Sequence, residues 1–225
     1  MNQSRLIKLK EAEAKALRLF HLIEKSGLIH AGQTELELNN KVYDLAKSEL
    51  GINKFWHKRI VRAGENTLFP YKENPSNLII TDESILFLDL GPIFDEFEAD
   101  IGRTYVIGKN PDHLKLKQDV EKSWYIARDF YLSNPNITAA ELFHFCEELA
   151  ENNGWEFGGE IAGHLVGKFP HERLMEIPKD SYIHPENDLK LHESLINLDE
   201  THWIIEIHFV DRIKKIGGFY EQLAI

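Results

Sequence analysis

The sequence predicts an α+β protein in which a mainly antiparallel sheet carries helices on its outer face. Three observations predict this class. Two helical segments open the chain, strand-like segments follow them, and a second pair of helices followed by strands completes it. Helices and strands grouped in this order are typical of helices packed on one face of an antiparallel sheet.

Four segments have the three- and four-residue apolar spacing of amphipathic helices: 4–25, 34–50, 112–132 and 138–152. The second segment opens with Thr34 and has Glu37 three residues later, and the fourth opens with Thr138 and Glu141. This pairing is the signature of a capping box, in which the two side chains satisfy backbone amides at the helix start. We therefore expect helices to begin at Thr34 and Thr138.

The expected strands lie between these helices and at the end of the chain. Residues 54–63 mix aromatic and β-branched side chains, and 84–91 is a short apolar run of strand length. Residues 94–107 follow a turn near Gly91 and are long enough to pair back against 84–91 as a hairpin. The last two expected strands are 203–211 and 218–225.

Length and composition favour one domain over residues 1–225. Hydrophobic residues make up 43% of the chain and charged residues 28%, as in ordinary globular proteins. The 26 basic and 37 acidic residues give a formal charge of -11, which disfavours a nucleic-acid partner. Residues 178–201 have no clear period, so we expect a long loop of the kind that forms binding or lid elements.

The single cysteine and the first residues bear on chemistry and location. Cys146 lies among aromatic and acidic residues with helical spacing, which predicts a packed core thiol rather than a nucleophile. The first 17 residues are charged and amphipathic, without the apolar core of a signal peptide, and no later stretch approaches the length of a membrane span. We expect a cytoplasmic protein without a membrane partner.

Two aspartates stand in apolar surroundings. Asp89 ends an apolar strand, where an ionised carboxylate is costly to bury without a cation or hydrogen-bond donors, and Asp100 follows 11 residues later. Hairpin pairing would bring the two carboxylates together, and their repulsion would favour a divalent cation between them. The alternative is that Asp89 caps a turn and Asp100 pairs with Arg103 or another base.

Two glutamates also lie in apolar surroundings, and two histidines follow a comparable pattern near glycines. Glu206 and Glu221 lie inside apolar strands, and glycines bracket His164, with His171 seven residues further on. An isolated strand glutamate usually points to solvent, and a lone histidine is most often structural. Four acids inside apolar strands, with an imidazole that glycines allow to approach a site, instead indicate a metal centre.

The ordered series of these residues resembles the ligand set of the pita-bread metallopeptidases, the superfamily of methionine aminopeptidase, aminopeptidase P, prolidase and creatinase. The matching residues are Asp89, Asp100, His164, His171, Glu206 and Glu221. The resemblance extends from about residue 55 to the C-terminus, and the types, order and spacing of the ligands make it specific. It implies the pita-bread fold and hydrolysis of a peptide bond by a metal-bridging hydroxide.

The resemblance also implies a role for each ligand. Asp89 would chelate one metal, Asp100 and Glu221 would bridge two, and His164 and Glu206 would complete the second. Four carboxylates carry a charge of -4 and two divalent ions +4, so the closed site would be neutral. Mn²⁺, Fe²⁺, Co²⁺ and Zn²⁺ all suit this donor set, and manganese is one candidate.

Catalytic roles follow from the same resemblance. Glu206 would pass a proton from water to the leaving amine, and His171 would stabilise the oxyanion or hold the substrate carbonyl. The family usually has another histidine facing the substrate, and here Pro70 or a neighbour takes that place. We hypothesise that His208, or His57 on the preceding strand, fills the vacant role.

Local sequence around 71–74 and 100–104 is similar to the Xaa-Pro group, although we expect no counterpart of that group's N-terminal domain. The resemblance therefore implies an aminopeptidase or dipeptidase that acts on a short peptide or dipeptide, with Xaa-Pro substrates ahead of N-terminal methionine. A homodimer is expected from the family. Two alternatives stay open: a pita-bread protein-binding module without catalysis, and a small-molecule C–N hydrolase of the creatinase type.

Overall fold

The computed structural model describes residues 5–69, 71–170, 178–193 and 201–225. Its helices are α1 (Arg5–Lys25), α2 (Glu35–Leu50), α3 (Pro111–Ser133) and α4 (Ala139–Asn153), with short 3₁₀ turns η1 (Gly64–Leu68) and η3 (Pro178–Ser181). Its strands are β1 (Ile60–Ala63), β2 (Ser84–Leu90), β3 (Ile93–Phe94), β4 (Phe97–Glu98), β5 (Ile101–Ile107), β6 (Glu156–Phe157), β7 (Gly163–Leu165), β8 (Trp203–Asp211) and β9 (Ile216–Leu223).

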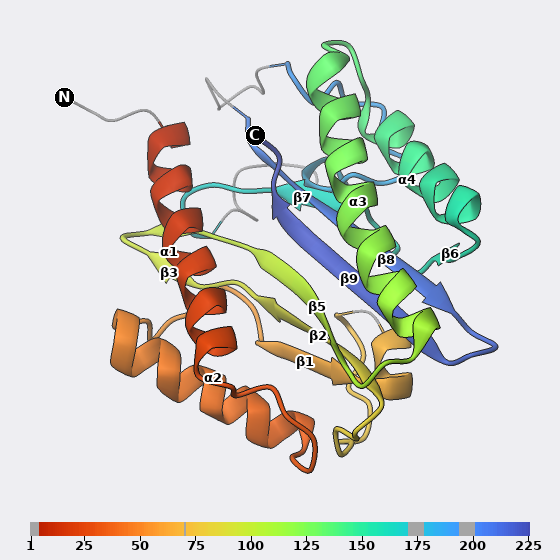
Figure 1. The fold of residues 1–225 in the computed structure, drawn as a ribbon. Helices are drawn as coiled ribbons and strands as arrows, with labels where there is room; N and C mark the ends of the chain where they lie inside the picture. Colours follow the sequence, from red (N-terminus) through yellow and green to blue (C-terminus); the bar gives the residue numbers. More distant parts are fainter. Residues whose placement is uncertain (1–4, 70, 171–177, 194–200) are drawn as a thin grey trace.

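Seven of the described strands form one antiparallel sheet in the order β1-β2-β5-β9-β8-β6, with β7 also paired to β8. The first and last parts of the chain meet in its middle, where β5 pairs with β9. Figure 1 shows α1 and α3 lying across the near side of this sheet, with α2 and α4 beside them. The predicted α+β arrangement of helices on an antiparallel sheet is confirmed.

Two apolar clusters join the helices to the sheet. Leu88 and Leu90 of β2 pack with residues of α1 and α2, and Ile205 and Ile207 of β8 pack with residues of α3 and α4. Trp124 adds a polar anchor, since its indole N–H donates to the Ile205 carbonyl at 2.8 Å. Each buried side chain of this size contributes about 1.5–3 kcal/mol to folding, so the clusters hold the helices to one face.

Both predicted capping boxes are present. The Thr34 side chain accepts a hydrogen bond from the Glu37 amide while the Glu37 side chain accepts from the Thr34 amide, and Thr138 and Glu141 repeat the arrangement at α4. Helix α2 ends at Gly51, whose φ of 65° lies in the left-handed region that glycine tolerates. Local sequence therefore sets these helix boundaries.

The predicted hairpin forms, but 94–107 is not one strand. Ser84–Leu90 pairs with Ile101–Ile107, whereas β3 and β4 make a separate small hairpin before β5. Its turn consists of Asp95 and Glu96, with φ of 47° and 75°, which turns the chain back on itself in two residues. The expected strand over 54–63 is likewise shorter, because only Ile60–Ala63 pairs with β2.

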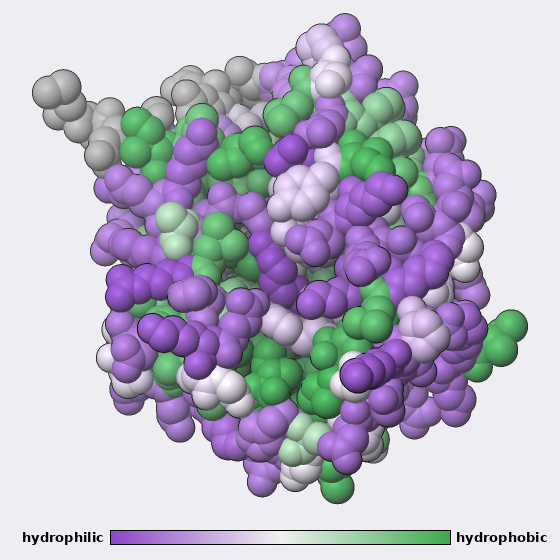
Figure 2. Space-filling model, in the orientation of Figure 1, coloured by the Kyte–Doolittle hydropathy of each residue, from purple (hydrophilic) through white to green (hydrophobic). Residues whose placement is uncertain are grey.

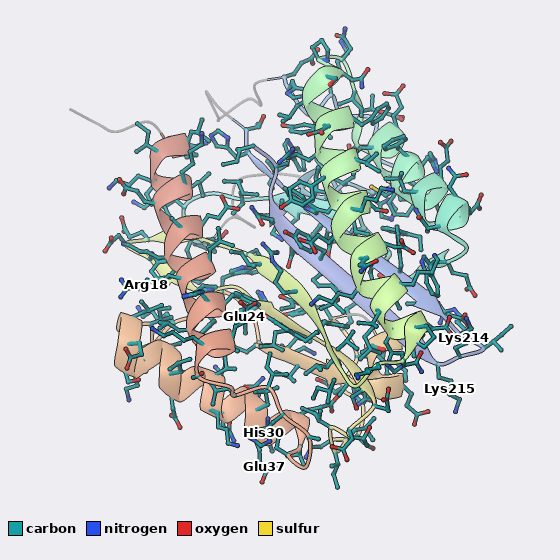
Figure 3. The ribbon with its side chains drawn as sticks, in the orientation of Figure 1. Arg18, Glu24, His30, Glu37, Lys214 and Lys215 are labelled. Atoms are coloured by element: carbon teal, nitrogen blue, oxygen red, sulfur yellow. The ribbon has the colours of Figure 1, made fainter. Side chains whose placement is uncertain are left out.

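The outer surface in Figures 2 and 3 is mostly polar, with separate apolar patches between charged side chains. Glu37 of α2 and Lys214 and Lys215 of the β8–β9 turn are among the exposed charges labelled in Figure 3. Within the described part of the chain, no helix combines the length and apolar character needed to cross a membrane.

Candidate metal centre

Strands β2 and β9, on either side of β5, bring two acidic side chains to one level of the sheet. Asp89 of β2 lies opposite Gly102 of β5, and Gly102 lies opposite Glu221 of β9. Because Asp89 alternates with Leu88 and Leu90, which pack toward the helices, its side chain lies on the other face. A Cβ at position 102 would lie 2.4 Å from the Phe219 ring and 3.0 Å from the Glu221 Cβ, so glycine makes room for the glutamate.

Two further carboxylates complete the group. Asp100 precedes Gly102 by two residues, which places its side chain on the same face as Asp89, and it is 3% exposed. Glu206 of β8 is the direct cross-strand partner of Glu221. Like charges in this relationship repel each other, so their position inside a sheet calls for compensating positive charge.

His164 supplies an imidazole to this group. Its Nε2 lies 3.1 Å from Asp100 Oδ2 and 3.7 Å from Glu221 Oε1, and its Nδ1 lies 2.7 Å from the Leu165 carbonyl. Gly163 has a φ of 138°, and a Cβ there would lie 2.0 Å from the Ile204 carbonyl oxygen. The glycine before the histidine is thus required for the close approach of β7 to β8.

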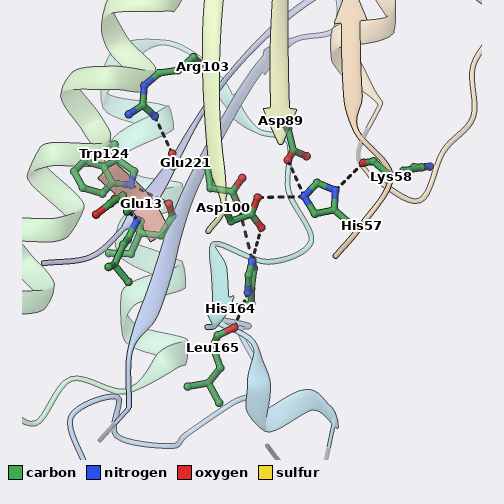
Figure 4. Close-up of polar contacts among 12 residues, drawn as sticks. Glu13, His57, Lys58, Asp89, Asp100, Arg103, Trp124, His164, Leu165 and Glu221 are labelled. Carbon is green, nitrogen blue, oxygen red and sulfur yellow. Dashed lines mark hydrogen bonds and ion pairs between the residues drawn. The ribbon is translucent and has the colours of Figure 1, made fainter. Parts of the chain in front are cut away.

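His57 and His164 contact different oxygens of Asp100 (Figure 4). His57 Nε2 is 3.2 Å from Asp100 Oδ1 and 3.3 Å from Asp89 Oδ1, and the His57 side chain is 2% exposed. The sequence pattern predicts a strand at His57 and makes this residue one candidate for the vacant catalytic role. The structure instead places it in an irregular segment before β1, in direct contact with the two aspartates.

Among the described residues, Arg103 forms no ion pair with Asp100, contrary to the alternative in which the two pair. The Arg103 guanidinium donates to the backbone carbonyls of Gly102 and Glu221, both at 2.8 Å, and to the Gln222 side chain. It also stacks 3.9 Å from the centre of the Tyr220 ring. Arg103 therefore connects β5 to β9, and the carboxylates of Asp89, Asp100 and Glu221 contact histidines instead.

Burial dominates the electrostatics of the group. It raises the pKa of Asp89 to about 7, partly opposed by His57, and raises the pKa of Glu206 to about 8. The pKa of Glu221 is also raised well above its usual value, by burial and by the charges of the two aspartates. Burial acts in the same direction on Asp100, but the contacts with His57 and His164 outweigh it and hold its pKa below the ordinary value.

Burial acts on the pKa values of the two imidazoles in the opposite sense, but their acidic neighbours outweigh it. Burial lowers the pKa of His57, but the charges of Asp89 and Asp100 outweigh it and raise that pKa to about 9. The pKa of His164 is also raised, by its contacts with Asp100 and Glu221, against the effect of burial. The acids thus draw positive charge onto the histidines, as a strongly anionic cavity requires.

The donor set fits divalent cations. Glu206 Oε1 and Glu221 Oε2 are buried and receive no hydrogen bond from the described part of the protein, and Asp89 Oδ1 has an ion-pair contact with His57 at 3.3 Å but no hydrogen bond. Two groups of three residues, His57–Asp89–Asp100 and Asp100–His164–Glu221, each hold ligand atoms within 4.8 Å of one another. Buried carboxylate oxygens without donors are costly unless a cation receives them, and Asp100 belongs to both groups.

The other candidate residues predicted from the sequence are not among the described members of this group. His171 and Pro70 lie outside the described residues. His208 shares a strand with Glu206, but its Nε2 lies 2.8 Å from the Thr67 carbonyl and its ring packs against Phe87 and Phe219. Burial lowers its pKa to about 4, and a catalytic role for it stays a prediction.

The chain matches one protein family over most of its length. The model of metallopeptidase family M24 matches residues 7–206. The chain belongs to this family. Among curated proteins, it is 26% identical over 193 residues to an Xaa-Pro dipeptidase of Lactobacillus delbrueckii subsp. lactis, covering 86% of this chain and 50% of the relative. An Xaa-Pro dipeptidase of Lactobacillus helveticus is 28% identical over 64% of this chain and 39% of its own length.

Solved structures show the same fold. A prolidase from Thermococcus sibiricus superposes with a TM-score of 0.75 at 21% identity, covering 96% of this M24 chain and 55% of that one. A methionine aminopeptidase from Rickettsia prowazekii gives 0.72 at 14% identity, covering 97% of this chain and 92% of that one. The predicted superfamily and its pita-bread fold are confirmed. The chain spans about half the length of the curated relatives it matches.

Proposed function

We propose that this M24 chain is a two-metal peptidase that hydrolyses Xaa-Pro peptide bonds near the N-terminus of a short peptide or dipeptide. The observation that carries the proposal is the pair of buried ligand groups that share Asp100. The curated relatives named as Xaa-Pro dipeptidases support the substrate class, and family membership supports metal-dependent peptidase activity. The proposed site is formed wholly by residues of this chain.

Five residues would hold the ions. Asp89 would bind the first, His164 and Glu206 the second, and Asp100 and Glu221 both. Asp100 contacts a different imidazole through each of its oxygens, which supports its shared role. Asp89, Glu206 and Glu221 each have a buried oxygen without a hydrogen bond from the described residues, which supports their role as ligands. When bound, two divalent ions lower the pKa of an attacking water and polarise the substrate carbonyl.

Glu206 is the proposed proton carrier. It is only half-buried, whereas its cross-strand partner Glu221 is 3% exposed, so it lies at the more open side of the group. One carboxylate oxygen would bind the ion, and the other would take a proton from water and pass it to the leaving amine. His171 remains the proposed stabiliser of the oxyanion, and the family position near Pro70 remains a departure.

Metal reconstitution tests the proposal. Protein stripped with a chelator should be inactive and should regain turnover when Mn²⁺, Co²⁺ or Zn²⁺ is added, with two ions bound per chain. An Xaa-Pro dipeptide, an Xaa-Pro-Yaa tripeptide and a Met-Yaa peptide should be compared in the same assay. Faster cleavage of the Xaa-Pro substrates supports the proposal. Cleavage of only the methionyl peptide would overturn the substrate class, and no metal with no turnover would favour the binding module.

Asp100→Asn is the sharpest variant because it removes charge shared by both groups. We expect fewer than two bound ions and a loss of turnover of about 10³-fold or more, since both ions depend on this carboxylate. Asp129→Asn on the exposed surface of α3 is the matched control and should retain both properties. Full activity in Asp100→Asn after stripping and reloading would contradict the assignment.

The single domain over 1–225, a homodimer and a cytoplasmic location remain parts of the proposal. Sedimentation at several protein concentrations tests the dimer. A monomer with full turnover would remove the dimer from the proposal without affecting the metal site.

A further inference from the structure

We propose that His57 is a sixth metal ligand, binding through Nε2 to the ion that Asp89 and Asp100 hold. Resemblance to the pita-bread enzymes assigns one imidazole to the metal ligands, His164, and does not include His57 among them. The inference deepens the proposed function and rests on it. Its consequence is a centre in which each ion has one nitrogen ligand.

The position of His57 is built by the fold. The Trp56 amide donates to the Gly91 carbonyl at 2.9 Å, so the segment before β1 is hydrogen-bonded to the residue two places after Asp89. A Cβ at position 91 would lie 2.3 Å from His57 Cδ2. Glycine at this position is therefore needed for the imidazole to lie against the end of β2.

The orientation of the ring is that of a metal ligand. His57 Nδ1 lies 2.7 Å from the Lys58 carbonyl, an oxygen that can only accept a hydrogen bond. Nδ1 therefore carries a hydrogen, and in the neutral ring Nε2 presents its lone pair to Asp89 and Asp100. A backbone carbonyl on the second ring nitrogen is the usual way in which proteins orient a ligating histidine.

His164 has the same arrangement at the other carboxylate oxygen of Asp100. Its Nδ1 lies 2.7 Å from the carbonyl of the following residue, Leu165, and its Nε2 points at Asp100 Oδ2. His57 uses the carbonyl of its own following residue, Lys58, and points at Asp100 Oδ1. The two imidazoles thus face the two oxygens of one shared carboxylate. The local geometry that supports His164 as a ligand supports His57 equally.

The surroundings favour a ligand over a surface histidine. The Trp56 ring packs against both imidazoles, with centroid distances of 4.4 Å to His57 and 5.2 Å to His164. Tyr71 packs on the outer side of His57 at 5.6 Å. These aromatic rings limit the motion of the imidazole, so its nitrogen is held toward the carboxylates before any ion binds.

A second imidazole changes which metal the centre prefers. Carboxylate oxygens suit Mn²⁺, whereas imidazole nitrogen suits Zn²⁺ and Fe²⁺. A neutral His57 adds a nitrogen donor without changing the balance of four negative charges against two divalent ions. We therefore expect this centre to bind Zn²⁺ in preference to Mn²⁺, and removal of His57 to weaken that preference.

The test compares His57→Ala with the exposed histidine variant His144→Ala. Metal-free wild-type protein and both variants are titrated with Co²⁺, with affinity and stoichiometry measured by calorimetry and ligand field by visible absorption. We expect His57→Ala to bind one ion at least about tenfold more weakly and to show an altered Co²⁺ spectrum. His144→Ala, whose ring contacts Glu147 on α4, should match the wild type.

The outcomes separate this inference from the proposed function. Wild-type affinities and spectrum in His57→Ala would overturn the ligand role while leaving the two-metal peptidase intact. A wild-type protein that binds no metal would overturn both. Loss of binding in a His57→Ala protein that circular dichroism shows to be folded supports the inference.

A measurement on the wild-type protein tests the ligand role independently of whether the variant folds. X-ray absorption of the Zn²⁺-loaded protein counts imidazole ligands directly, and we expect about one imidazole per zinc ion. Half that value, one imidazole shared between two ions, would overturn the assignment.

Discussion

At the scale of single residues, glycines decide how closely the acidic side chains approach. Gly102 lies between Asp89 and Glu221 in the sheet, and Gly163 lets β7 lie against β8 just before His164. Neither glycine is a ligand. Each removes a side chain at the one place where the backbone or a neighbouring carboxylate needs the space.

Gly102→Ala should therefore affect both stability and the site. Its Cβ would overlap the Phe219 ring and press on Glu221, so we expect a loss of about 1–3 kcal/mol in the free energy of unfolding and at least about tenfold weaker metal binding. Urea unfolding and Co²⁺ titration measure the two effects.

Gly218→Ala is the matched control on β9, because its Cβ would meet Leu116 of α3 on the helix-covered face. It should cost stability without changing metal affinity. Equal metal affinity in Gly102→Ala and wild type would show that the glycine does not set the position of Glu221.

At the scale of secondary-structure elements, local hydrogen bonds determine where a helix begins. The capping box at Thr138 satisfies two backbone amides at the start of α4, and α4 packs with α3 over the β8–β9 half of the sheet. The site lies on the other face of these strands. Stability and site geometry should therefore be separable at this helix.

Thr138→Ala should lower the free energy of unfolding by about 1 kcal/mol, because the Glu141 amide loses its side-chain acceptor. Denaturation measures this effect, and metal affinity should be unchanged. Glu148→Ala, on the exposed surface of the same helix, is the control and should change the stability by no more than a few tenths of a kcal/mol. A cost no larger than that of the control would contradict the capping role.

At the scale of the whole molecule, the acidic centre makes stability depend on pH and metal. A carboxyl whose pKa is raised by folding stabilises the protein at low pH, and this contribution is lost as the pH rises through the folded value. Asp89 and Glu206 have folded pKa values of about 7 and about 8. His57 is raised from 6.5 to about 9, and it also loses its contribution as the pH rises.

The Tm of the metal-free protein should therefore fall between about pH 6.5 and about pH 9. His208, whose pKa is lowered to about 4, contributes an opposite trend only below this window. Zn²⁺ binds the deprotonated ligands, so the rise in Tm on adding metal should grow with pH. Calorimetry with and without metal measures both slopes. Glu206→Gln should flatten the metal-free slope, and a Tm that rises through this window would contradict the electrostatic account.

Much of the molecule was predictable from sequence for local reasons. Apolar periodicity and the capping boxes at Thr34 and Thr138 located the helices, because those signals depend on neighbouring residues. The acids were recognisable because Asp89, Glu206 and Glu221 interrupt apolar strands. Their type and order were enough to indicate a metal centre and its family.

Tertiary structure decided what depends on contacts between distant segments. The turn at Asp95–Glu96 splits the expected strand because the chain makes a second small hairpin, β3–β4, before joining the sheet. His208 looked equivalent to Glu206 by alternation, yet its ring bonds to the Thr67 carbonyl. His57 reached the centre because its segment pairs with Gly91 after β2. Periodicity assigns a side chain to a face, but the packing of other segments against that face determines what the side chain touches.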